Sequence, residues 1–259
     1  MGHLRLGRLP KTQKWTQVVD LLDTAPTDVP GIARAVVEAA DGQLRFLASD
    51  SSLAYCFWIL TRVTWAARQP DFLVKLEQLG IFTSRDASVL TFIAQLTDIA
   101  QGQISRNPQS GPFGELASLA MSRALTETIG EHGTTLFGSS MEDLQRACAS
   151  YSTRRRFGVL ARQFFGDFFA RMLRYFVAKE LANHVGFEKG IRGIRESSEF
   201  VRSLDLHARQ SARIVEEFAS GWYSKHNWES KGEISLEDAQ GFVAVALRKL
   251  RMEMKRENG

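Results

Sequence analysis

The sequence predicts an all-α fold, a multi-helix globule with orthogonal or bundle-like packing and a basic N-terminal arm. Apolar residues recur at the three- and four-residue intervals of amphipathic helices along nearly the whole chain. Stretches with the two-residue alternation typical of strands are few and short. All six prolines lie within the first 112 of the 259 residues, so no proline interrupts helices in the remainder.

Through the first hundred residues, helical patterns follow one another closely. One helix is expected after Thr12, and a second runs from about Pro30 to Ala40, since proline is tolerated in a first helical turn. Ser51 or Ser52 opens a third helix, so apolar that we expect it at the centre of the core. A short helix at 71–78 ends before Gly80, and the next carries the apolar stripe Val89, Phe92, Ile93, Leu96 and Ile99.

In the second half of the chain, two helix starts resemble capping boxes. Ser140–Asp143 and Ser235–Asp238 each place a hydroxyl and a carboxylate three residues apart, with Asp instead of the preferred Glu. The last helix has an apolar face formed by Val243, Leu247, Leu250 and Met254. Basic residues near its end complement the helix dipole.

The segment 153–182 is the most informative part of the chain, because seven Arg or Lys are interleaved with seven aromatic residues. Gly158 and Gly166 weaken an isolated helix, so support from tertiary packing is expected. The polar side chains expected opposite the apolar face or at its margins are Arg155, Arg156, Arg162, Gln163, Asp167 and Arg174. Three interpretations stay open: a core helix with arginines at its edges, a phosphate-binding face, and a membrane-surface helix.

The breaker-rich stretch Ser105–Gly114 is the best candidate for a domain boundary. We expect an N-terminal helical lobe over 1–104, a linker over 105–112 and a proline-free C-terminal lobe over 113–259. The alternative is one continuous domain.

Positive charge is concentrated in three places on a slightly acidic body. Residues 1–14 carry a local charge of +4, residues 15–152 carry −6, and residues 153–182 return to +5. The third place is 248–256, where five Arg or Lys are opposed only by Glu253. If these basic segments converge in space, they form a surface for a polyanion or an acidic protein; if they are scattered, they are solvated helix faces. The candidate binding residues are Arg154, Arg155, Arg156, Arg162, Arg174, Arg248, Lys249, Arg251 and Lys255, and the candidate docking-arm residues are Arg5, Arg8, Lys11 and Lys14.

A second aromatic and basic group lies at 222–228. Trp222, Tyr223 and Trp228 either stack on bases or hold a peptide, if exposed, or close the end of a bundle, if buried.

Catalytic signatures are weak. Glu180 and His184 have the i, i+4 spacing of half a carboxylate–histidine metal site, but no second half is evident, and surface pairing is the favoured interpretation. Zinc-protease, zinc-finger and serine-hydrolase motifs are missing from the sequence. We therefore expect no catalytic residues, no metal and no cofactor.

The function predicted from these patterns is that of a non-catalytic subunit of a larger cytosolic assembly. Cys56 and Cys148, each within an apolar helical pattern, indicate buried thiols in a reducing compartment. The expected partner is an acidic protein or a nucleic-acid backbone. The alternatives are a peripheral membrane effector that uses the helix at 153–182 and a metal-dependent enzyme centred on Glu180 and His184.

Overall fold

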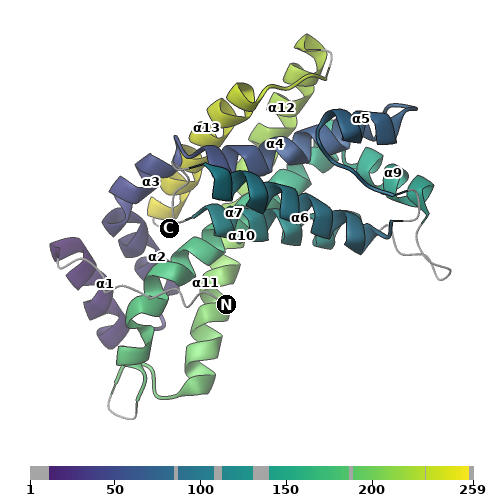
Figure 1. The fold of residues 1–259 in the computed structure, drawn as a ribbon. Coiled ribbons are helices and arrows are strands. Elements are labelled where there is room, and N and C mark those ends of the chain that lie inside the picture. Colours follow the sequence, from purple (N-terminus) through teal and green to yellow (C-terminus); the bar gives the residue numbers. More distant parts are fainter. Residues whose placement is uncertain are drawn as a thin grey trace.

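The computed structural model describes residues 12–84, 87–107, 113–130, 140–186, 189–230 and 232–256, and these form the predicted all-α globule. Within these ranges no β-strand occurs, and an isolated bridge pairs Val185 with Ile191. The helices are α1 (Gln13–Thr24), α2 (Val29–Ala39), α3 (Asp41–Leu47), α4 (Ser51–Ala66), α5 (Phe72–Gln78), α6 (Val89–Arg106), α7 (Gly114–Leu125), α9 (Met141–Ser150), α10 (Arg154–Leu181), α11 (Ile194–Ser211), α12 (Arg213–Glu229) and α13 (Leu236–Lys255), with a π-helical turn at Thr126–Gly130 and a 3₁₀ turn at Ala182–His184 (Figure 1).

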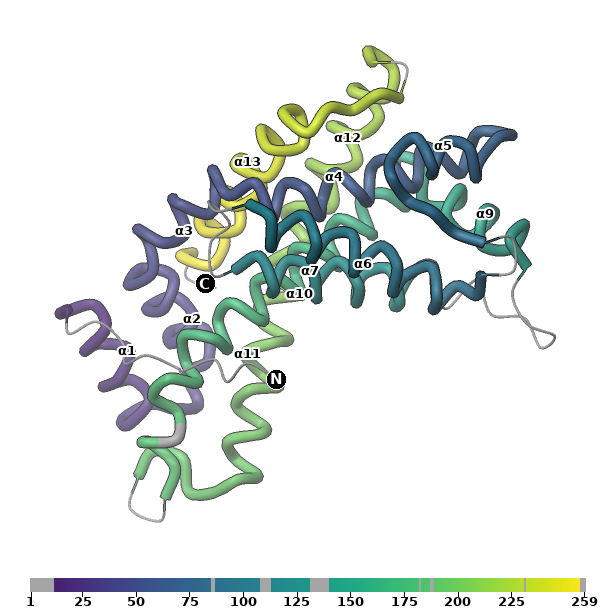
Figure 2. The backbone as a smooth tube through the Cα atoms, in the orientation of Figure 1, coloured from purple at the N-terminus to yellow at the C-terminus, as the bar shows by residue number. Residues whose placement is uncertain are grey.

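The 28-residue helix α10 is the central element of the fold. At 1.5 Å per residue it is about 42 Å long, and it packs against α7, α11 and α12 (Figure 2). Its apolar side chains are buried on nearly all sides, which confirms the core interpretation of the segment; the buried phenylalanines are Phe157, Phe164, Phe165, Phe168, Phe169 and Phe176.

One side chain of α10 lies where sequence reasoning did not place it. Asp167 was expected on the polar margin, but it is only 1% exposed. Its carboxylate accepts hydrogen bonds of 2.5 Å from the guanidinium groups of Arg171 and Arg209, and Arg123 Nε lies 3.5 Å away. A buried carboxylate needs such partners, because desolvation of an unpaired charge is costly. Asp167 therefore links α10 to α7 and α11.

The apolar helix α4 forms the second layer of the core, as its composition predicts. Phe57 of α4 stacks on Phe242 of α13 at a ring-centroid distance of 4.6 Å and contacts Phe165 of α10 at 5.5 Å.

Both predicted capping boxes are present at the starts of α9 and α13. Gly80, which follows α5, has a φ of 75°, which is the conformation expected of a C-terminal glycine.

A single cluster of buried side chains runs from Trp15 in α1 to Met254 in α13, through segments on both sides of 105–112. Cys56 and Cys148 belong to this cluster as free thiols. Burial raises the pKa of Cys148 to about 12, so this thiol stays protonated at neutral pH. In the part of the chain that the structure describes, no helix combines the length and apolar character that crossing a bilayer requires.

Candidate functional site

Several of the predicted binding residues have partners within the molecule. Arg162 pairs with Glu216 at 3.1 Å, and Arg174 pairs with Asp205 at 2.9 Å. Three others lie on α13: Arg251 and Lys255 contact the carboxylate of Asp41, and Lys249 Nζ lies 5.4 Å from the ring centroid of Phe218. These contacts give the five cations structural roles between helices.

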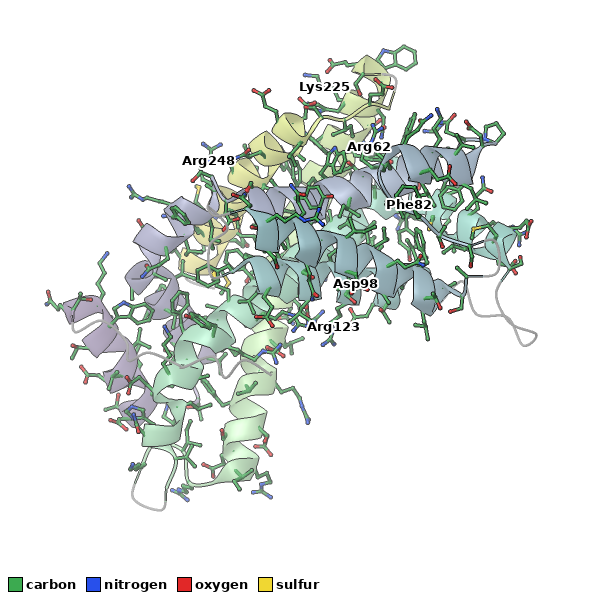
Figure 3. All side chains as sticks on the ribbon, in the orientation of Figure 1. Arg62, Phe82, Asp98, Arg123, Lys225 and Arg248 are labelled. Carbon is green, nitrogen blue, oxygen red and sulfur yellow. The ribbon has the colours of Figure 1, made fainter. Side chains whose placement is uncertain are left out.

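The remaining predicted cations fall into separate groups. Arg248 is exposed on α13 (Figure 3), and Lys14 is exposed on α1, where its Nζ donates to the Glu38 carbonyl at 3.4 Å. Arg5, Arg8 and Lys11 lie outside the described residues. The third group is the run of three arginines that opens α10.

Arg154, Arg155 and Arg156 are exposed in the first turn of α10, and this turn contains no acidic residue. The first backbone N–H groups of a helix have no acceptor within it, and the helix dipole adds roughly half a positive charge there. Cations at this end oppose the dipole, whereas α9 and α13 begin with acidic residues. An anion bound at the start of α10 would relieve this repulsion.

The first of these arginines, Arg154, lines a pocket of about 740 Å³ that contains cations from three segments. Arg68 follows the end of α4, Arg154 opens α10, and Lys225 comes from the last turns of α12. Neither Arg68 nor Arg154 forms an ion pair with any described residue, while Lys225 Nζ lies 3.8 Å from exposed Glu229. The pocket is therefore strongly positive, and its cations are accessible.

Hydroxyl and amide groups complete the lining. Ser152, Thr153 and Ser224 add hydroxyls, and Asn227 adds an amide. The Asn227 Oδ1 atom is buried and has no hydrogen-bond partner among the described residues. Such an atom costs about 1–3 kcal/mol when it is left unsatisfied, so a hydrogen-bond donor beside it would be stabilising.

Buried Tyr223 connects the pocket to the core. Its hydroxyl lies 3.0 Å from Thr64 Oγ1 of α4, and its ring stacks on Phe157 at a centroid distance of 3.7 Å. Burial raises the pKa of Tyr223 above its ordinary value, against the opposing effect of hydrogen bonds from Thr64 and Asn227. The phenol therefore stays neutral and provides a fixed support for the pocket.

The segment after α12 holds the end of that helix against α4. Arg62 Nη1 donates to the Gly232 carbonyl at 3.0 Å, and Trp58 Nε1 donates to the Ile234 carbonyl at 3.0 Å. Gly232 has a φ of 91°, and a Cβ built there would lie 1.5 Å from Trp65 Nε1. Only glycine allows this approach, so the turn after α12 packs directly against α4. Figure 3 shows Arg62 on α4 and Lys225 near the end of α12.

The three aromatic residues predicted at 222–228 have different environments. Tyr223 is buried, and Trp222 packs against Phe57 and Phe242, so these two close the end of the bundle. Trp228 is 88% exposed and lies at the pocket. The cluster thus divides into two inward-facing aromatic residues and one exposed tryptophan.

A second pocket, of about 510 Å³, contains His184. The His184 Nδ1 lies 2.5 Å from Asp23 Oδ1, whereas Glu180 accepts a hydrogen bond of 3.0 Å from Asn183. Glu180 and His184 therefore have different partners. Within the described ranges, no group of three or more His, Cys, Asp or Glu side chains is arranged to hold a metal ion.

The sequence pointed to Arg154–Arg156 and Trp228 but not to Arg68, an isolated cation after α4 with no distinguishing local pattern.

No protein-family model, curated protein or solved structure matches this chain.

Proposed function

We propose that this protein is a non-catalytic binding module that holds phosphate groups of a polyanionic partner in the pocket between α4, α10 and α12. The observation that carries the proposal is the convergence of Arg68, Arg154 and Lys225 at the positively charged start of a 28-residue helix. Within a larger cytosolic assembly, this pocket would be the contact with the partner's backbone.

The donor set favours phosphate over carboxylate. A phosphate in a polyanion backbone has two bridging oxygens besides its two charged oxygens, and phosphate groups are bound by helix N-termini, guanidinium groups and hydroxyls together. The pocket offers guanidinium groups, an ammonium group and the hydroxyls of Ser152, Thr153 and Ser224. A carboxylate from an acidic protein would use only part of this set.

The experiment measures binding of fluorescein-labelled inorganic polyphosphate by wild type and by Arg154→Glu at low and moderate salt. Arg195→Glu is the matched control, because Arg195 also lies in the first turn of a helix, α11, and is 88% exposed there. We expect Arg154→Glu to weaken binding at least tenfold and Arg195→Glu to leave it unchanged.

The same variants separate binding from stability. An acidic residue at a helix N-terminus is favourable by about 0.3–1 kcal/mol, so Arg154→Glu should maintain or slightly raise the melting temperature without ligand. In Arg195→Glu this gain is offset by the loss of the i,i+4 pair with Glu199, so its melting temperature should change little. Weaker binding by Arg154→Glu accompanied by a lower melting temperature would indicate a folding defect. Equal binding by all three proteins would refute the proposal, and binding of polyglutamate in preference to polyphosphate would indicate an acidic protein partner.

A further inference from the structure

The indole of Trp228 does not pack against the core of this fold. It is 88% exposed, whereas Trp15 is buried and Trp58, Trp65 and Trp222 pack against the core. A large aromatic side chain contributes to folding by burying apolar area, which Trp228 does not do. The indole is therefore available to a ligand at the mouth of the pocket.

Trp228 is next to the cations of the pocket. It follows Lys225 by three residues on α12, a spacing that places two side chains on the same face of a helix. Arg68 and Arg154 line the same pocket. A ligand that crosses this site meets an aromatic plane and phosphate-binding groups together.

This combination matches the chemistry of a nucleotide chain, in which every unit carries both a phosphate and an aromatic base. Proteins that bind single strands without sequence preference combine a positive groove with aromatic side chains on which bases stack. In a duplex the base faces are stacked inside the helix and cannot reach an indole.

We propose that the polyanion is a single-stranded nucleic acid, with its phosphates at Arg68, Arg154 and Lys225 and one base stacked on the indole of Trp228. This inference rests on the proposed function, since it assigns a ligand class to the same pocket. The stacked base makes recognition tolerant of sequence but selective for single strands.

The test titrates wild type, Trp228→Ala and Trp228→Phe with a deoxythymidine 12-mer, a duplex of the same length and inorganic polyphosphate. Loss of one stacked base should weaken 12-mer binding about 5- to 150-fold in Trp228→Ala, with partial recovery in Trp228→Phe. Polyphosphate binding should not change. The 12-mer should quench tryptophan fluorescence in wild type and much less in Trp228→Ala.

The outcomes separate the two proposals. If polyphosphate binds but the 12-mer binds no better in wild type than in Trp228→Ala, or the duplex binds as tightly as the single strand, the nucleic-acid inference fails and the phosphate site stands. If neither polyphosphate nor the 12-mer binds, the proposed function itself fails. Because Trp228 is exposed, equal melting temperatures of the variants will confirm that folding is intact.

Discussion

Gly158 of α10 lies directly against Ser220 of α12, so that a Cβ built at residue 158 would be 2.1 Å from Ser220 Oγ and 2.5 Å from the Glu216 carbonyl oxygen. Gly166 has a similar role toward α11, where its Cβ would lie 3.3 Å from Ala212 Cβ and from Arg209 Cα. The two glycines thus allow α11 and α12 to approach α10 closely. This packing positions the end of α12 beside the start of α10, where the pocket forms.

Gly158→Ala should destabilise the protein, although alanine is the better helix former by about 1 kcal/mol. The added methyl group meets the backbone of α12, which cannot move as a side chain does, and overpacking of this kind costs about 1–3 kcal/mol. Gly241→Ala is the control, since a Cβ there meets nothing within 4 Å, and it should stabilise the protein. Urea unfolding of both variants measures the difference; stabilisation by both would show that α10 and α12 are not this close.

The same two glycines show why the fold class could be predicted from sequence while the packing could not. Helical periodicity and capping boxes are local patterns, so the positions of α1, α4, α6 and α13 follow from neighbouring residues. Whether a glycine weakens a helix or admits a neighbour depends on residues that are distant in sequence. From the neighbouring residues alone, only the weakening of the helix by Gly158 and Gly166 could be predicted.

Asp167 is a buried carboxylate that pairs with arginines of α7, α10 and α11. Its removal leaves Arg171 without a carboxylate partner, whereas Arg209 keeps Glu127 at 3.5 Å. Because both guanidinium groups are partly exposed, the cost is below that of a fully buried charge left unpaired. We expect Asp167→Asn to lower the free energy of unfolding by about 1–3 kcal/mol, measured by urea denaturation at neutral pH.

Asp205 is a second carboxylate, on α11, and its substitution is the control for the substitution of Asp167. Its carboxylate pairs with Arg174, yet its pKa is raised, because burial outweighs the attraction of Arg174 and Arg209. The folded state therefore disfavours the charge of Asp205, and Asp205→Asn should change stability little. A larger loss in Asp205→Asn than in Asp167→Asn would contradict this ranking.

The candidate site was predictable only in part for the same reason. The arginines at 154–156 and Trp228 are conspicuous in the sequence because they belong to local clusters. Arg68 is isolated in sequence and joins them only because α4 ends at the same place. Conversely, Arg251 and Lys255 belong to a conspicuous basic cluster, but both pair with Asp41, which is distant in the chain.

The pairing at Asp41 makes stability depend on pH. Partial burial tends to raise the pKa of this carboxyl, but Arg251, Lys255 and Arg45 together hold it below the ordinary value. A pKa lowered by folding gives stability that is present above about pH 3.9 and is lost as the pH falls through the folded-state pKa. Asp41→Asn should therefore be less stable than wild type at pH 7, and the difference should shrink toward pH 3. A difference that is constant with pH would show that the carboxylate is not the stabilising group.

The pocket also predicts how strongly salt weakens binding. For single strands, the logarithm of the binding constant falls with the logarithm of salt concentration by about 0.7 per neutralised phosphate. Three contacts at Arg68, Arg154 and Lys225 therefore give a slope of about −2 for the deoxythymidine 12-mer. Arg68→Gln should bring the slope to about −1.4, whereas Arg248→Gln, on α13 outside the pocket lining, should leave it unchanged. Fluorescence titrations at four salt concentrations measure the slopes, and equal effects of the two substitutions would mean that the strand contacts α13 as closely as it contacts the pocket.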